Sequence, residues 1–128
     1  MERLVSLRHA LEKAFAPDTA VPGTASEGRP PSAGHCAAVS YLVWRELGGE
    51  MVSAMVQGQS HWFNRLRIGN VIVDVDLTGD QFGFAPISIA MAGKLYPGTR
   101  VRNYSDLKPE TIQRAETLAG RAGIGRMD

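Results

Sequence analysis

The chain has a single cysteine, Cys36, so it cannot form an internal disulfide. A protein without disulfides fits a reducing compartment, and we expect a cytoplasmic location. The sequence also lacks any apolar run of about 18 residues, the length that a membrane-spanning helix requires. Residues 1–16 follow an amphipathic helical pattern that carries charges, so we expect no secretory signal there.

The chain also has no large excess of positive or negative charge. The 14 Lys and Arg residues are nearly balanced by 13 Asp and Glu residues, which leaves a formal net charge of +1. The basic residues are scattered, and only the pairs Arg65/Arg67 and Arg100/Arg102 lie close together. Binding to nucleic acid or to an anionic membrane needs a concentrated basic surface, so we expect neither partner. The oligomeric state is left open.

Apolar periodicity predicts three helices in one domain of 128 residues. Leu4, Leu7, Leu11 and Phe15 recur at helical spacing, which predicts a helix over residues 3–15 that ends before Pro17. The apolar run 37–47 follows Cys36 and stops at two glycines, as expected of a helix buried on most faces. A C-terminal helix is predicted over residues 109–122, with Pro109 as its first residue.

The middle of the chain predicts an antiparallel sheet. Residues 50–57 have the pattern of a strand, and Gly69-Asn70 is a two-residue hairpin signal between two further strands over residues 61–77. Residues 84–98 carry no clear signal, and residues 99–103 indicate another strand. The predicted fold is α+β, with a central buried helix carrying Cys36 packed on a sheet of three to five strands and flanked by N- and C-terminal helices.

The hairpin determines which side chains share a face. Pairing Ile68 with Val71 places Arg65 opposite Asp74 and brings His61 and Asp76 to one face as diagonal neighbours, roughly 7 to 8 Å apart at the backbone. The other face is an apolar stripe, made of Trp62, Leu66, Ile68, Val73, Val75 and Leu77.

Cys36, His61 and Asp76 are therefore a candidate catalytic triad. A thiolate is favoured by the positive end of a helix dipole and by a nearby imidazolium, and a carboxylate can hold the imidazole in one tautomer. We choose Asp76 as the third member because Asp74 faces Arg65. Residues 17–35, a loop with four prolines and three glycines, would wrap across the site and deliver Cys36.

Cys36 and the two nearby histidines also have a structural and a metal-binding interpretation. A lone cysteine beside an apolar helix is commonly a small buried hydrophobic residue. A zinc site would need Cys36, His35, His61 and an aspartate, but adjacent residues at a helix start diverge, so His35 and Cys36 would not both be ligands. We expect no metal and no cofactor.

Five short motifs resemble the bacterial YunG-like family over about residues 30–82. They are Pro31-Ser-Ala-Gly-His-Cys36, Leu47-Gly-Gly-Glu50, His61-Trp-Phe-Asn64, Asp76-Leu-Thr78 and Gln81-Phe82. The order Cys, His, Asp also resembles the papain-like and transglutaminase-like superfamily. This resemblance implies a nucleophile at Cys36, a general base at His61 and an orienting carboxylate at Asp76. His35 stands where the family commonly has a glutamine, so it would lie near the oxyanion, and Gln81 and Asn64 would line the site.

The function expected from these residues is cysteine-dependent acyl transfer on a peptide or small amide. Hydrolysis, deamidation and transamidation share the same first step, and the sequence does not choose among them. The alternative is a catalytically inactive papain-like binding or interaction module in which Cys36 is structural.

Overall fold

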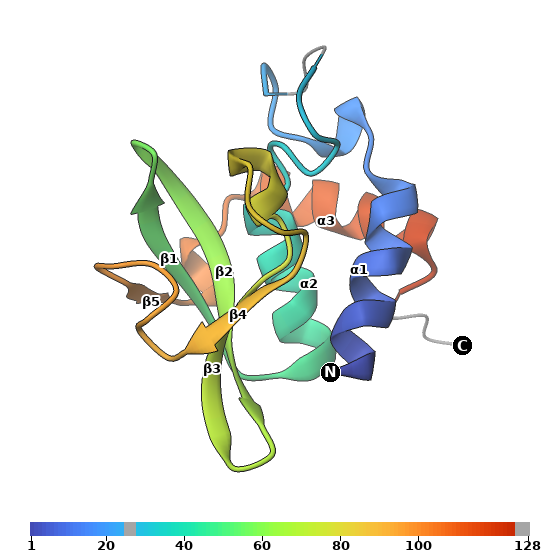
Figure 1. The fold of residues 1–128 in the computed structure, drawn as a ribbon. Helices are drawn as coiled ribbons and strands as arrows, with labels where there is room; N and C mark the ends of the chain where they lie inside the picture. Colours follow the sequence, from blue (N-terminus) through green and yellow to red (C-terminus); the bar gives the residue numbers. More distant parts are fainter. Residues whose placement is uncertain (25–27, 125–128) are drawn as a thin grey trace.

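The computed structural model describes residues 1–24 and 28–124. This part of the chain forms three α-helices and a five-stranded antiparallel sheet (Figure 1). The helices are α1 (Glu2–Ala14), α2 (Cys36–Leu47) and α3 (Pro109–Ala122). The strands are β1 (Glu50–Val56), β2 (Gln59–Ile68), β3 (Val71–Asp76), β4 (Ser88–Met91) and β5 (Arg100–Arg102). Three short 3₁₀ helices connect them: η1 (Pro17–Thr19), η2 (Gly79–Phe82) and η3 (Tyr104–Asp106).

The sheet has the order β4-β3-β2-β1-β5, and α2 packs on β1 and β2 (Figure 1). The other two helices lie beyond α2 and contact each other. This arrangement confirms the α+β class and the central helix predicted from the sequence. No helix in the described part of the chain is both long enough and apolar enough to cross a membrane.

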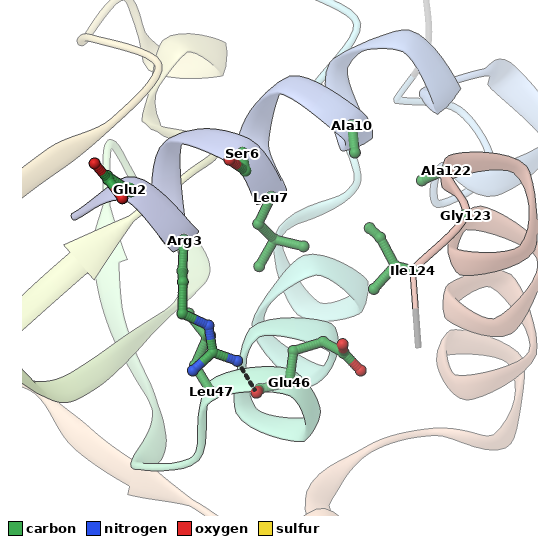
Figure 2. Close-up of a pocket in the computed structure, with 10 residues that line it drawn as sticks. All are labelled: Glu2, Arg3, Ser6, Leu7, Ala10, Glu46, Leu47, Ala122, Gly123 and Ile124. Carbon is green, nitrogen blue, oxygen red and sulfur yellow. Dashed lines mark hydrogen bonds between the residues drawn. The ribbon is translucent and has the colours of Figure 1, made fainter. Parts of the chain in front are cut away.

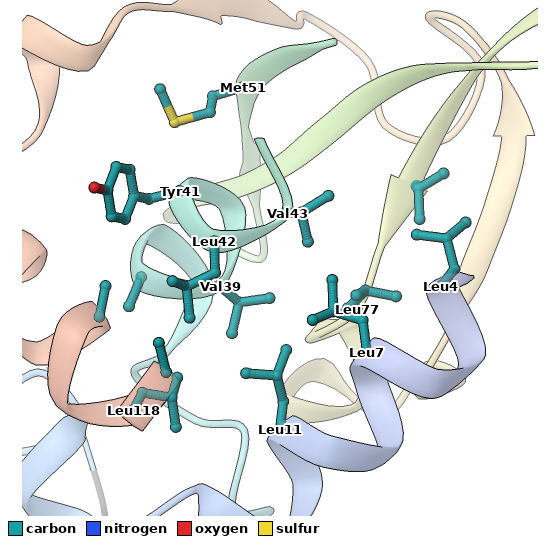
Figure 3. Close-up of a cluster of buried hydrophobic side chains, with 14 of the residues drawn as sticks. Leu4, Leu7, Leu11, Val39, Tyr41, Leu42, Val43, Met51, Leu77 and Leu118 are labelled. Carbon is teal, nitrogen blue, oxygen red and sulfur yellow. The ribbon is translucent and has the colours of Figure 1, made fainter. Parts of the chain in front are cut away.

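The main hydrophobic core lies between the helices and one face of the sheet (Figure 3). Leu11 of α1, Leu42 of α2 and Leu118 of α3 are completely buried in it. Burying a leucine side chain contributes about 2 kcal/mol, so the three helices are held together chiefly by this cluster. The predicted apolar stripe of β2 and β3 supplies the sheet side of the same core.

The β2–β3 register agrees with the sequence prediction. Ile68 pairs with Val71 and Arg65 pairs with Asp74, around a turn in which Gly69 has a φ of +61°. Gly69 can adopt this left-handed conformation without steric cost. Because side chains alternate along strands, this register places His61 and Asp76 on the face opposite the main core.

Three features of the structure were not predicted from the sequence. The 84–98 segment, which carried no clear signal, contains β4 and pairs with β3. The 17–35 loop contains η1, and its residues 25–27 lie outside the described residues. Arg8, a charged residue next to Leu7 in the predicted N-terminal helix, is buried in the structure.

Candidate functional site

A buried histidine and carboxylate form the centre of the site. His61, near the start of β2, and Asp76, at the end of β3, are both completely buried. The Nε2 atom of His61 lies 2.7 Å from Oδ2 of Asp76, which is hydrogen-bond distance. The carboxylate can only accept here, so Nε2 carries the proton. Asp76 therefore selects the tautomer of the imidazole and orients its ring.

Two further residues hold Asp76 in place. Tyr96 donates its hydroxyl to Oδ2 of Asp76, while the backbone amide of Thr78 donates to Oδ1 at 3.0 Å. Burial and the neighbouring carboxylate raise the pKa of Tyr96, so its hydroxyl stays protonated and remains a donor. Gly79 packs against the same group, because a Cβ at this position would lie 2.8 Å from Oδ2 of Asp76. Neither Tyr96 nor Gly79 was predicted from the sequence as part of this site.

An aromatic enclosure keeps water away from the pair. The ring of His61 contacts Phe82 edge-on at a centroid distance of 4.9 Å and Tyr96 at 5.6 Å. Phe63 and Tyr96 are themselves packed in a small apolar cluster on this face of the sheet. Electrostatic interactions are stronger in such surroundings than in water, so the contact with Asp76 has a large effect on the protonation of His61.

Protonation of His61 reflects two opposed effects. Burial alone would lower its pKa, but the hydrogen bond to Asp76 and a further interaction with Cys36 outweigh burial and raise the pKa to about 9. At neutral pH the folded protein thus holds an imidazolium beside a carboxylate. This is the state in which a histidine can stabilise a thiolate.

We expect this protonation to make folding stability depend on pH. A histidine whose pKa rises from about 6.5 in the unfolded chain to about 9 on folding stabilises the protein fully below pH 6.5. This contribution, up to about 3 kcal/mol, should be lost as the pH rises through 9. Urea unfolding at several pH values will measure it. His61→Gln should flatten the slope between pH 6.5 and 9, and an unchanged slope would contradict the assignment.

The thiol is placed at the start of the central helix. Cys36 is the first residue of α2, is partly exposed and is not in a disulfide. Its side chain is close enough to His61 to contribute to the raised pKa of that residue. Since Nε2 of His61 is bonded to Asp76, the nitrogen left for the thiol is Nδ1, which is buried and has no hydrogen-bond partner among the described residues. The structure thus brings the three predicted residues together in the order Cys36, His61, Asp76.

A comparison with protein families gives one match. The family model described as YunG protein matches residues 3–119. The chain belongs to the YunG protein family. No curated protein and no solved structure matches it.

His35, the residue before Cys36, makes its side-chain hydrogen bonds away from His61 and Asp76 in the described part of the chain. Its Nδ1 lies 3.1 Å from the carbonyl oxygen of Ala33, and its Nε2 lies 2.7 Å from Oγ1 of Thr19. The ring of His35 packs on that of Phe15, with the ring centroids 4.5 Å apart. Burial lowers the pKa of His35. Both nitrogens are thus used by the loop that precedes α2. Neither nitrogen is therefore free to donate to an oxyanion, the role that the resemblance implied for His35.

Gln81 and Asn64 also have structural partners. The side-chain amide of Gln81 donates to the carbonyl of Thr78, the residue before η2, at 3.1 Å. Asn64 is buried and donates to the carbonyl of Ser40 at 2.9 Å, which joins β2 to α2. Asn64 therefore lies on the helix side of β2, away from the face that carries His61.

A partly buried ion pair supports the turn that follows Asp76. Arg8 of α1 donates to the carbonyl of Leu77 at 2.6 Å and to Oδ2 of Asp80 at 3.0 Å. Ser32, four residues before Cys36, donates to the other oxygen of Asp80. This network connects α1, the turn after β3 and the loop that enters α2, so it holds the segments that carry Asp76 and Cys36.

The remaining sequence candidates have other environments. Asp74 receives two hydrogen bonds from Arg65, at 2.7 and 3.1 Å, and one from the amide of Gly93 at 2.8 Å. Asp74 pairs with Arg65 as expected, and Asp74 itself is completely buried, whereas the side chain of Arg65 is partly exposed. In the described ranges no three His, Cys, Asp or Glu side chains are grouped as a metal site would require.

A pocket lies between α1, the end of α2 and the residues at the end of α3 (Figure 2). Its volume is about 470 Å³, and Leu7 and Ile124 form part of its apolar wall. Arg3 crosses one side and donates to the carbonyl of Glu46 at 3.1 Å. None of the triad residues lines it, so we attribute no chemistry to this pocket.

Proposed function

We propose that this YunG protein is a cysteine-dependent acyl-transfer enzyme with a papain-like or transglutaminase-like arrangement of the triad. The observation that carries the proposal is the buried His61–Asp76 hydrogen bond, with the second imidazole nitrogen left for Cys36. A histidine with only a structural role would satisfy both nitrogens within the protein, as His35 does. The single free cysteine suits a reducing compartment, and we propose that the reaction takes place in the cytoplasm.

In the first half of the reaction, the Cys36 thiolate attacks the carbonyl carbon of an amide and forms a carbon–sulfur bond. The oxyanion that develops is stabilised by the amide of Cys36, since amides in the first turn of a helix have no intrahelical acceptor. The C–N bond then breaks, and the imidazolium of His61 gives its Nδ1 proton to the leaving amine. The products are a thioester on Cys36, a free amine and a neutral His61.

In the second half, neutral His61 takes a proton from a water molecule that attacks the thioester. The carbon–sulfur bond breaks, a carboxylic acid leaves, and the thiolate and imidazolium are restored. An amine in place of water would give transamidation, and ammonia as the leaving group would make the reaction a deamidation. Asp76 stays ionised throughout and stabilises the imidazolium.

The proposal can be tested without knowing the substrate by using p-nitrophenyl acetate, an activated ester. We expect a burst of nitrophenol close to one equivalent per protein, because acylation of a reactive thiol is faster than hydrolysis of the thioester. Mass spectrometry of the quenched protein should find one acetyl group on Cys36. The matched control is Cys36→Ala, which should show neither burst nor adduct.

The alternative is a binding module in which Cys36 is structural. In that case the folded protein would acquire acetyl groups no faster than a free thiol at the same pH. A burst of equal size in Cys36→Ala would also overturn the proposal, because the ester would then be acylating other nucleophiles.

A further inference from the structure

A pocket of about 400 Å³ borders the nucleophile. Cys36 and Ala37 line it from the start of α2, and Ser60 and Trp62 line it from β2. Val21, from the loop that precedes α2, forms another wall. This volume lies in the range of sites that hold small ligands or a few residues of a peptide. A substrate group attached to the carbonyl attacked by Cys36 would occupy this space.

The lining of the pocket is rich in positive charge. Arg102, Lys108 and Arg114 line it, against a single carboxylate, Asp106. None of the three cations forms an ion pair within the described residues, whereas Arg8, Arg45, Arg65 and Arg121 all do. For a protein with a net charge of +1, three unpaired cations around one pocket are a marked concentration.

Two of these cations are held in position by neutral partners. Nε of Arg102 donates to Oγ of Ser53 at 2.7 Å, and its guanidinium lies over the ring of Trp62 at 5.5 Å. Arg114 donates to Oγ1 of Thr111 at 3.3 Å. Each guanidinium has five N–H donors, so most of its hydrogen-bonding capacity remains free for a ligand. Their planar geometry is suited to a carboxylate.

The N-termini of two helices add to the positive electrostatic potential of this pocket. Both α2 and α3 begin at this pocket, at Cys36 and just after Lys108, and neither N-terminus has a side-chain cap. Free amides at a helix start carry partial positive charge, so both helices favour an anion here. They supplement the three side chains and are not needed for the inference by themselves.

We infer that the site acts on amides that carry a carboxylate near the scissile bond, as in an acidic peptide. This inference rests on the proposed function, since it names the substrate class of the same thiol. The carboxylate would be bound by Arg102, Arg114 and Lys108 while Cys36 attacks the neighbouring carbonyl. A long polyanion is not favoured, because the cations are concentrated around one pocket rather than along an extended surface.

The charge of the pocket can be measured with two alkylating reagents of similar size. Iodoacetate is anionic and iodoacetamide is neutral, and both react with the thiolate. The rate constant for iodoacetate divided by that for iodoacetamide does not depend on the fraction of Cys36 that is thiolate. This ratio therefore reports the electrostatic potential at Cys36. We expect the ratio to be about tenfold higher in the folded protein than in the same protein unfolded in urea, and to fall as salt is added.

Single variants identify which residues produce the positive potential at Cys36. Arg102→Gln, Lys108→Gln and Arg114→Gln should each lower the ratio about two- to fivefold, and Asp106→Asn should raise it. The control is Arg67→Gln, which removes the same charge from an exposed residue of β2 outside the pocket and should leave the ratio unchanged. A ratio equal to that of the unfolded protein overturns the inference. So does an equal loss in Arg67→Gln, because the effect would then be the general charge of the protein.

A binding measurement separates this inference from the proposed function. N-acetyl-glutamate amide and N-acetyl-glutamine amide differ only in charge, and both can be titrated by NMR into Cys36→Ala, which cannot form an acyl intermediate. Stronger binding of the glutamate compound, lost in Arg102→Gln, supports the inference even if the wild-type protein shows no acylation. Equal binding of the two compounds, or none, overturns it even if Cys36 is acylated by an activated ester.

Discussion

Replacing His61 with alanine is expected to slow the alkylation of Cys36 by iodoacetamide about a hundredfold at pH 6.5. Only the thiolate reacts, and a free cysteine with a pKa of about 8.5 is roughly 1% ionised at this pH. In the wild-type protein His61 is protonated, since its pKa is raised to about 9, and its positive charge is beside the thiol. Mass spectrometry of timed, quenched samples will give both rate constants.

Two controls make the His61 result specific. His9→Ala removes the exposed histidine of α1 and should leave the rate at Cys36 unchanged. A thermal melt of His61→Ala will establish that the variant is folded at the temperature of the assay, because an unfolded chain would expose Cys36 in any case. Equal rates in wild type and folded His61→Ala, both matching a free thiol, would exclude the triad.

Much of the fold could be predicted because local signals and tertiary packing agree. The periodicity of residues 3–15 and 109–122 and the glycines after Leu47 predicted the three helices to within one residue at most ends. The Gly69-Asn70 signal was sufficient for the β2–β3 register, since a period of two leaves no freedom once the turn is known. That register in turn predicted that His61 and Asp76 share a face, and the structure places them in hydrogen-bond contact.

What could not be predicted depends on contacts between distant segments. Tyr96 reaches Asp76 from a segment without a secondary-structure signal, and nothing in its immediate sequence indicates a buried hydroxyl. Arg8 is buried because its partners come from the turn after β3, about 70 residues away in the chain. His35 has the position of a catalytic donor in the sequence, but Thr19 and Ala33 bind both of its nitrogens.

The same substitution at the two aspartates of β3 should slow the alkylation of Cys36 at Asp76 but not at Asp74. Asp76→Asn is expected to slow alkylation of Cys36 at pH 6.5 about tenfold or more. His61, Tyr96 and Thr78 all donate hydrogen bonds to Asp76, so the new amide group must direct N–H against one of these donors. Loss of the negative charge also removes the main support for the imidazolium.

Asp74→Asn provides the matched comparison, because it makes the same change two residues earlier on the same strand. Asp74 binds Arg65 and the amide of Gly93, and has no contact with His61 or Cys36 among the hydrogen bonds of the described residues. Asp74 is buried while Arg65 is partly exposed, and hydrogen bonds to a charged group contribute about 1.5 to 3 kcal/mol, so this variant should unfold at lower urea concentration. Its alkylation rate in the folded state should match the wild type.

The pair of variants thus separates stability from reactivity, with urea unfolding as one measurement and alkylation of Cys36 as the other. A site built on Asp76 predicts lost reactivity in Asp76→Asn and lost stability without lost reactivity in Asp74→Asn. If Asp74→Asn were the variant with the slow thiol, the third member of the triad would be misassigned. If both variants kept the wild-type rate, the hydrogen bond between His61 and Asp76 would serve only the packing of β2 against β3, and the case for catalysis would fail with it.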